Sequence, residues 1–360
     1  MFKIFNGMRL FMFLAWNEIK RNKLKFSLII GVLIMISYLL FLLSGLASGL
    51  MNMNREGIDK WQADAIVLNK DANQTVEQSL FNTDDIENTY KNQTTLKQSG
   101  VIVSNGNNEE NALLFGVTDH SFLVPDMIEG KKFNSDNEVI ADETLKDKGF
   151  KIGDKLSLSQ SDENLKIVGF SESAKYNASP VLFSNNNTIQ KINPSLDKST
   201  TNAVVVKDKN WNNQSLNNNL EAIGIESFVE NLPGYTAQNL TLNFMISFLF
   251  IISATVIGIF LYVITLQKTN LFGVLKAQGF TNGYLAKVVL SQTFIIAMIG
   301  TLIGLILTLI TGAFLPSAVP IKFSAVTLII YGVVLIVVSL IGSLFSILTI
   351  RKVDPLKAIG

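Results

Sequence analysis

The chain has 360 residues, of which 48% are apolar and 16% are charged, whereas roughly 25% are charged in an average soluble domain. Together with a mean hydropathy of +0.33, this composition indicates a membrane protein rather than a soluble enzyme. The sequence has no cysteine, which excludes disulfides, thiolate-bound metals and a cysteine nucleophile.

The net charge of +1 hides an uneven distribution of charges along the chain. Residues 1–25 carry six basic residues and one acid, Glu18, and residues 268–287 carry three lysines and no acid. Residues 51–242 carry 17 basic and 27 acidic residues, a net charge of −10. Because the one large polar region is acidic, the distribution argues against a nucleic-acid-binding protein.

The N-terminal residues 8–25 mix large apolar side chains with a basic second half. This mixture is typical of a helix in the inner membrane interface, with Trp16 as an amphipathic anchor. The alternative is the plain flank of a signal anchor. A charge-free window then runs from Phe26 to Asn54. It exceeds the 7–15 apolar residues of a signal peptide, so we expect an uncleaved membrane span.

Residues 51–242 are numerous enough to form a core of their own. Short β-rich runs between Asn-rich turns predict an α+β domain. Strands are expected at Asp64–Leu68, Val101–Ser104, Leu113–Val117, Glu138–Ala141, Lys155–Leu158, Leu165–Phe170, Val181–Phe183 and Ala203–Val206. Helices are expected at Asp142–Lys148 and Gln214–Ala222.

Further charge-free windows lie within Asn231–Gln267, Val288–Ile321 and Phe323–Ile350, and each is long enough to span a bilayer. The short segments beside the spans are basic, which predicts that both termini and the 268–287 loop are cytoplasmic and that residues 51–242 lie outside. The expected fold class is an integral membrane α-helical protein with four transmembrane helices, arranged one plus three, and an inserted α+β extracytoplasmic domain.

The expected division of the chain follows from these windows. It comprises a cytoplasmic interfacial amphipathic helix (1–25), transmembrane helix one (26–50), the extracytoplasmic domain (51–242), transmembrane helix two (243–267), a cytoplasmic coupling loop or helix (268–284), transmembrane helix three (285–314), a short outer loop (315–322), transmembrane helix four (323–350) and a cytoplasmic tail (351–360).

Small residues recur at four-residue spacing in three of the windows. The pairs are Gly45 and Gly49, Gly300 and Gly304, and Gly342 and Ser346. Such faces let helices approach closely. Contacts within one chain and contacts between two chains fit this pattern equally well.

Motifs for catalysis and nucleotide binding are absent from the sequence. There is no G-x-x-x-x-G-K-[ST], H-E-x-x-H or G-x-S-x-G motif, so the chain is expected neither to be an enzyme nor to hydrolyse ATP itself. His120 is the only histidine, so a multi-histidine metal site within one chain is excluded. We interpret His120 as a surface or turn residue. No span carries an ionisable residue near its centre, which argues against an ion-coupled transporter. The pattern favours a membrane component that uses energy supplied by a partner.

The predicted cytoplasmic loop Gln267–Tyr284 carries apolar residues that a short solvated loop does not need, punctuated by glycines. We expect a short helix that places these side chains in a partner's groove. The alternative is a loop packed on lipid.

Several stretches resemble one family. The layout, LKAQGFTNGYL (Leu275–Leu285), the tail IRKVDPLKAI (Ile350–Ile359) and the run EVIADETLKDKGFKIGDKLSL before LKIVGF are similar to the FtsX-like, MacB-type (type VII) permeases of ABC transporters. The chain departs from the family's RxxExGxLKA loop, because Asn270 or Leu271 replaces the acid. The stretches WNEIKRNKLKFSLI, FLLSGLASGL, LPGYTAQNLTLNFMI and FLYVITLQK look most like the haem-export (Hrt-type) permeases of Gram-positive bacteria.

The resemblance implies a homodimer of this chain with two separate cytoplasmic ATPase subunits, in a bacterial plasma membrane. It implies haem as the transported ligand, no permanently bound cofactor, ATP used by the partner, and export by mechanotransmission. The coupling residues it implies are Phe272, Gly273, Lys276, Ala277, Gly279, Phe280, Asp354 and Pro355.

Haem iron is held by His, Met, Tyr or Cys in known cases. Candidate haem contacts near the outer ends of the first two spans are Met51, Met53, Glu56, Tyr235, Phe244 and Met245. Each has a plainer interpretation: methionine as packing, Tyr235 as an interfacial residue and Glu56 as a solvated acid. Two alternatives stay open. One is the same permease acting on antimicrobial peptides, lipids or lipophilic drugs, and the other is a relay that regulates an extracellular cell-wall hydrolase.

Overall fold

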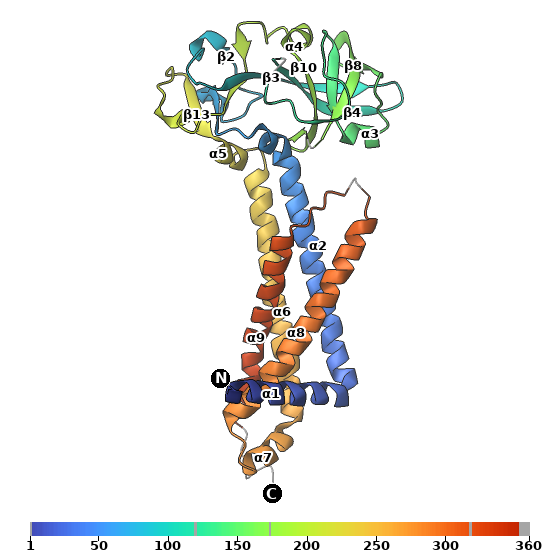
Figure 1. Cartoon of the computed structure of the whole chain (residues 1–360), viewed down its shortest axis with the longest axis vertical. Helices are drawn as coiled ribbons and strands as arrows, with labels where there is room; N and C mark the ends of the chain where they lie inside the picture. The colour runs from blue at the N-terminus through green and yellow to red at the C-terminus, as the bar shows by residue number, and fades with distance from the viewer. Residues whose placement is uncertain (1, 119–120, 173, 317–318, 353–360) are drawn as a thin grey trace. The chain divides into compact units, whose positions relative to one another are not determined.

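A computed structural model of the chain describes residues 2–118, 121–172, 174–316 and 319–352, with side chains from residue 12 onward (Figure 1). The chain divides into two compact units, Met1–Gly49 with Leu240–Gly360, and Leu50–Asn239. We call them the helical unit and the sheet domain. His120, Asp354 and Pro355 lie outside the described residues.

The helical unit is built from long apolar helices. Its elements are α1 (Phe2–Arg21), α2 (Lys23–Trp61, which continues into the sheet domain), α6 (Tyr235–Gln267), α7 (Thr269–Ala277), α8 (Asn282–Phe314) and α9 (Ala325–Arg351). Within the described residues, four of these helices, α2, α6, α8 and α9, are long and apolar enough to cross a membrane, which confirms the predicted spans. Figure 1 shows α1 lying across the long helices at the end where α7 also lies.

The small-residue faces pack helices together within this one chain. A Cβ added at Gly300 on α8 would lie 2.7 Å from Leu33 Cβ on α2, and one at Gly304 would lie 2.0 Å from Ser37 Oγ. The Ser37 hydroxyl donates a hydrogen bond of 3.0 Å to the Gly300 carbonyl oxygen. On α9, a Cβ at Gly342 would lie 2.3 Å from the Ala254 carbonyl oxygen of α6. In both pairs, the glycines therefore contact another helix of the same chain.

The Gly45–Gly49 face of α2 contacts the segment that leads into α9. A Cβ at Gly49 would meet the Pro320 carbonyl oxygen at 2.0 Å, and one at Gly45 would meet the Phe323 ring at 2.3 Å. The Lys322 amide donates to the Gly45 carbonyl oxygen at 3.0 Å. Glycine is required at position 49 because chain backbone occupies the place of a side chain, whereas at position 45 the Phe323 ring occupies that place.

The sheet domain is an α+β unit around a mixed sheet. Its strands are β1 (Ala65–Asn69), β2 (Phe81–Asn82), β3 (Gln93–Ser104), β4 (Glu109–Val117), β5 (Met127–Gly130), β6 (Glu138–Asp142), β7 (Lys155–Leu158), β8 (Ser161–Ser171), β9 (Lys175–Tyr176), β10 (Ser179–Asn185), β11 (Thr200–Thr201), β12 (Ala203–Val206) and β13 (Leu220–Gly224). In the described residues, eleven strands form one sheet. Nine follow the order β13-β1-β12-β3-β4-β10-β6-β8-β5, and two lie off this path, β7 paired with β3 and β8, and β9 paired with β10. Strand β10 pairs with β4 in parallel and β8 with β6 in parallel.

The short helices of the sheet domain are α3 (Thr144–Asp147), α4 (Asn186–Ile192) and α5 (Ile225–Glu230). The helix expected at Gln214–Ala222 is wrong, because Leu220–Gly224 forms β13 and pairs with β1. The helix expected from Asp142 begins only at Thr144, since Asp142 ends β6 and accepts a hydrogen bond from the Thr144 amide at 3.0 Å.

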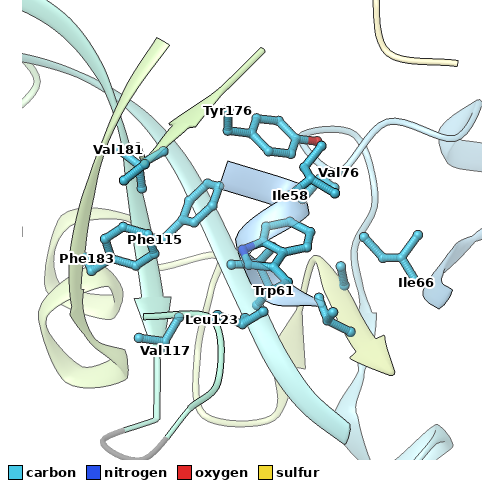
Figure 2. Packing of buried hydrophobic residues seen from close by; sticks show 14 of the residues in the cluster. Ile58, Trp61, Ile66, Val76, Phe115, Val117, Leu123, Tyr176, Val181 and Phe183 are labelled. Atoms are coloured by element: carbon cyan, nitrogen blue, oxygen red, sulfur yellow. The ribbon is translucent and has the colours of Figure 1, made fainter. Parts of the chain in front are cut away.

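The last turns of α2 lie in the core of the sheet domain. Trp61 is 1% exposed, and its ring stacks on Tyr176 with centroids 6.2 Å apart. Figure 2 shows Trp61 and Ile58 among apolar side chains of the strands, including Phe115 and Phe183. The amides of Asn177 and Ala178 donate to the carbonyl oxygens at 54 and 53. The end of α2 is therefore fixed to the sheet domain by packing and by backbone hydrogen bonds.

Candidate functional site

An apolar groove lies between α2 and α6 in the helical unit. Its volume is about 550 Å³, and it is lined by Leu39, Leu42, Leu43, Leu46, Phe244, Met245, Phe248 and Leu249. Small-molecule sites have volumes of about 300–1,000 Å³ and mostly apolar walls. From the sequence, these leucines could be assigned only to a membrane span. The spacing of leucines that line a groove does not differ from that of leucines that face lipid.

Two aromatic rings stand at the surface of this groove. Phe244 is 64% exposed, and its ring centroid lies 4.7 Å from that of Phe248, at an interplanar angle of 57°. Their π-faces can stack on a flat ligand. Met245 contributes a thioether, which can bind haem iron. The groove therefore has the shape and chemistry to hold a flat, largely apolar molecule.

The other predicted haem contacts belong to the sheet domain, and each has an interaction there. Tyr235 is buried in the core that also contains Trp61, and its side chain makes a hydrogen bond with Arg55. Glu56 accepts a hydrogen bond of 2.7 Å from Asn52 Nδ2. Met51 packs against the same core, and the Met53 carbonyl oxygen accepts from the Ala178 amide at 3.2 Å. A haem role for Tyr235 or Glu56 thus requires an exchange of these partners.

Arg55 is the central charge of this region, and sequence reasoning did not single it out. It donates two hydrogen bonds of 2.8 Å to the Glu226 carboxylate and contacts Asp59 one turn away at 2.9 Å. These bonds favour the ionised carboxylate and hold the pKa of Glu226 below its ordinary value. The four-residue spacing of Arg55 and Asp59 was the available signal.

The predicted coupling residues divide between two faces of α7 and its flanks. Phe272 and Gly273 are buried, and Phe272 packs with Leu285, Val289 and Ile350. Lys276 Nζ donates to the Ile350 carbonyl oxygen at 2.7 Å. The packing of Phe272 and the hydrogen bond of Lys276 fix α7 to α8 and α9.

The opposite face of α7 and the turn after it are exposed. Its apolar side chains are Leu271, Val274, Ala277 and Phe280. Gly279 has φ +94°, a conformation that permits the turn after the helix. This exposed apolar face is the part of α7 that a partner can contact. The docking role of all the predicted residues stays a prediction.

A second groove of about 820 Å³ lies between α6 and α9. Tyr262, Phe345 and Lys352 are among its lining residues. Across the described residues, no three His, Cys, Asp or Glu side chains are grouped so that they could hold a metal ion.

Known proteins resemble the chain at three levels. Residues 237–355 match the family model FtsX-like permease C-terminal. The chain is 29% identical over 350 residues to the protein named hemin transport system permease protein HrtB of Staphylococcus epidermidis, across 96% of this chain and 99% of that protein. It is 23% identical over 280 residues to an ABC transporter permease of Mycobacterium tuberculosis, across 72% of each. The periplasmic region of MacB from Actinobacillus actinomycetemcomitans aligns with a TM-score of 0.35 and 13% identity, over 47% of this chain and 92% of that chain.

The resemblance inferred from the sequence motifs is thus confirmed by a family-model match to residues 237–355 and by relatives that align with nearly the whole chain. The four helices that can cross a membrane fit this assignment. Residues 237–355 match an FtsX-like permease C-terminal domain, and nearly the whole chain is similar to permeases of ABC transporters.

Proposed function

We propose that the chain exports haem from the membrane, as the permease subunit of an ABC transporter. The observation that carries the proposal is the apolar α2–α6 groove with its exposed Phe244–Phe248 pair. Relatives named for hemin transport, which match 96% of the chain, support the same cargo.

The groove suits a cargo that arrives through lipid. Haem is flat and largely apolar, so it partitions into a bilayer and can reach a lined groove from the side. Phe244 and Phe248 would stack on the macrocycle, and Met245 is a candidate iron ligand. Tyr235, Glu56, Met51 and Met53 remain candidate contacts from the sheet domain.

The energy for export comes from a separate ATPase. Two copies of this chain pair with two ATPase subunits in the bacterial plasma membrane. The termini and α7 lie in the cytoplasm, and residues 51–242 lie outside. The ATPases push on the exposed face of α7 and on the tail at Asp354 and Pro355, and α2 and α6 move as levers that open and close the groove. The exposed Leu271, Val274, Ala277 and Phe280 on and beside α7 support this docking.

A haem titration of the purified chain in nanodiscs, read at the Soret band, tests the cargo. We expect the Soret-band change to saturate at about one haem per dimer, as for a defined binding site rather than partition into lipid. Phe244→Ala should weaken binding about tenfold, because ring stacking adds about 0.5–1.5 kcal/mol to the loss of buried area. Phe314→Ala is the matched control, since Phe314 is 85% exposed on α8 and does not line the groove. A signal that rises without saturation, or equal effects of both variants, would contradict the haem site.

The charge of the sheet domain favours one second candidate, export of cationic peptides. Residues 51–242 carry a net charge of −10, which attracts cations at a distance. A chain that fails to saturate with haem but binds a cationic peptide in a salt-dependent manner would support this alternative.

A further inference from the structure

In α1, the side chains of residues 12–21 are described, and one narrow face of them packs on the other helices of the helical unit. Ala15 and Ile19 are buried, and Ile19 packs with apolar residues of α2, α6 and α8. Glu18 lies three residues after Ala15 and therefore on the same side of the helix. The remaining large apolar side chains are exposed, namely Met12, Phe13, Leu14 and Trp16. One face of α1 thus holds the helices, and the other is left for the membrane interface.

Glu18 joins three helices through its carboxylate. Lys268 Nζ forms an ion pair with Glu18 Oε1, and Gln292 Nε2 donates to Glu18 Oε2. The side chains of Glu18 and Lys268 are 23% and 15% exposed, and Gln292 is buried. Lys268 Nζ also lies 5.4 Å from the centroid of the Phe26 ring, where a cation is attracted to the π-face.

Lys268 lies in the chain between α6 and α7. Helix α6 ends at Gln267 and α7 begins at Thr269, so Lys268 is the link between a spanning helix and the helix that faces the ATPase. Gln292 lies in α8, the helix against which Phe272 of α7 packs. We propose that Glu18 is the joint that couples α7 to α1 and α8, so that a push on α7 moves these helices as one body. The push rests on the proposed ATPase docking, whereas the joint itself does not.

Low exposure makes the joint stronger than an ordinary surface ion pair. Water competes for exposed pairs and leaves them little net strength, whereas removal of one partner from a shielded pair leaves an uncompensated charge. Burial lowers the pKa of Lys268 to about 8. Without Glu18, this ammonium group would be left without its counter-charge, and the contact that joins α1 to the start of α7 would be lost.

The absence of native cysteine permits a direct test in the whole chain. Labels are attached at Phe13→Cys on α1 and Asn270→Cys on α7, both exposed positions, and the label-to-label distance distribution is measured in nanodiscs by electron paramagnetic resonance. Glu18→Gln and Lys268→Met are each compared with Arg21→Gln, a control that removes an exposed charge from the same helix. The exchanged pair Glu18→Lys with Lys268→Glu keeps the attraction with the charges reversed.

We expect one narrow distribution in the unchanged background and in Arg21→Gln, about a twofold broadening in each single variant, and recovery in the exchanged pair. Unchanged width in both single variants would overturn the joint. The joint would also be overturned if the exchanged pair stays broad while its thermal stability matches that of Arg21→Gln. The broadening in the single variants would then not depend on the ion pair.

Haem tolerance of the native host tests the transmission step. Glu18→Gln should reduce tolerance about tenfold, within the 5–150-fold range of typical coupling between sites, while haem binding at the Soret band stays unchanged. Full tolerance with a broadened distance distribution would overturn the coupling role. If the unchanged chain neither binds haem nor confers tolerance, the proposed cargo fails, and the distance measurement still decides the joint.

Discussion

Replacement of Gly342 by alanine tests whether α6 and α9 pack backbone against backbone. The new Cβ would lie 2.3 Å from the Ala254 carbonyl oxygen, whereas ordinary contact begins at 3.4 Å. The helices must therefore separate by about 1.1 Å at this point, the difference between those two distances. Overpacking of this kind costs about 1–3 kcal/mol. Alanine also gains about 0.8–1.0 kcal/mol of helix propensity over glycine, which conceals part of the cost.

Gly31 provides the control that removes the propensity term. It lies within α2, and a Cβ at Gly31 meets no atom within 4 Å, so Gly31→Ala gains the propensity without the clash. The difference between the two variants therefore isolates the overpacking, about 1–3 kcal/mol. This corresponds to an unfolding constant about 5–150-fold larger for Gly342→Ala than for Gly31→Ala.

The assay is equilibrium unfolding of the purified chain in mixed micelles with increasing sodium dodecyl sulfate, followed by circular dichroism. Both variants are measured against the unchanged chain, and the free energy of unfolding is taken at a common detergent fraction. If Gly342→Ala and Gly31→Ala change that free energy equally, the two helices do not pack at Gly342, and the small-residue faces must serve contacts with a second chain.

Three further predictions concern the exposed face of α7 that we propose for ATPase docking, the core of the sheet domain and the response of stability to acid. Ala277→Asp should abolish haem tolerance without loss of membrane insertion, because it places a charge in an apolar docking face; full tolerance would mean that the face is misassigned. Trp61→Ala should destabilise the sheet domain by about 3–5 kcal/mol, seen as faster limited proteolysis of the full chain; unchanged proteolysis would contradict its core position. The pKa of Glu226 is lowered by Arg55, so the bond contributes stability above the carboxylate's unfolded pKa of about 4.3. That contribution should be lost as pH falls through the lower folded value. Glu226→Gln should be less stable than the unchanged chain at neutral pH, with a difference that shrinks on acidification; a constant difference would contradict the coupling.

The sequence sufficed for the spans because lipid imposes a simple rule. Every backbone group in a bilayer must be paired within the chain, so a long apolar window has essentially one solution. Glycine spacing likewise identified the faces that pack closely, although it could not name their partners. The spacing of Gly300 and Gly304 would be the same if they contacted a helix of a second copy instead of Leu33 and Ser37 of their own chain.

The sequence failed where the outcome depended on distant pairing. The run Gln214–Ala222 was expected to be a helix, but Leu220–Gly224 pairs with β1, which lies about 150 residues earlier. Sheet pairing of this kind overrides local preference. The burial of Phe272 was hidden for the same reason, because the face of α7 that turns inward is set by where α8 and α9 lie.

The two faces of α7, one buried and one exposed, suit the proposed role of this short helix in coupling the spanning helices to an ATPase subunit. A helix exposed on all sides would slide when pushed, and one buried on all sides could not be reached. Phe272 and Lys276 tie its inner side to α8 and α9, and Lys268 at its start is tied to Glu18. The exposed Leu271 and Val274 then offer a surface that is attached on its inner side to neighbouring helices through the buried Phe272 and the partly buried Lys276 and Lys268. In the proposed transporter, a force on that surface would be carried into the spanning helices, as the proposed coupling to a separate ATPase requires.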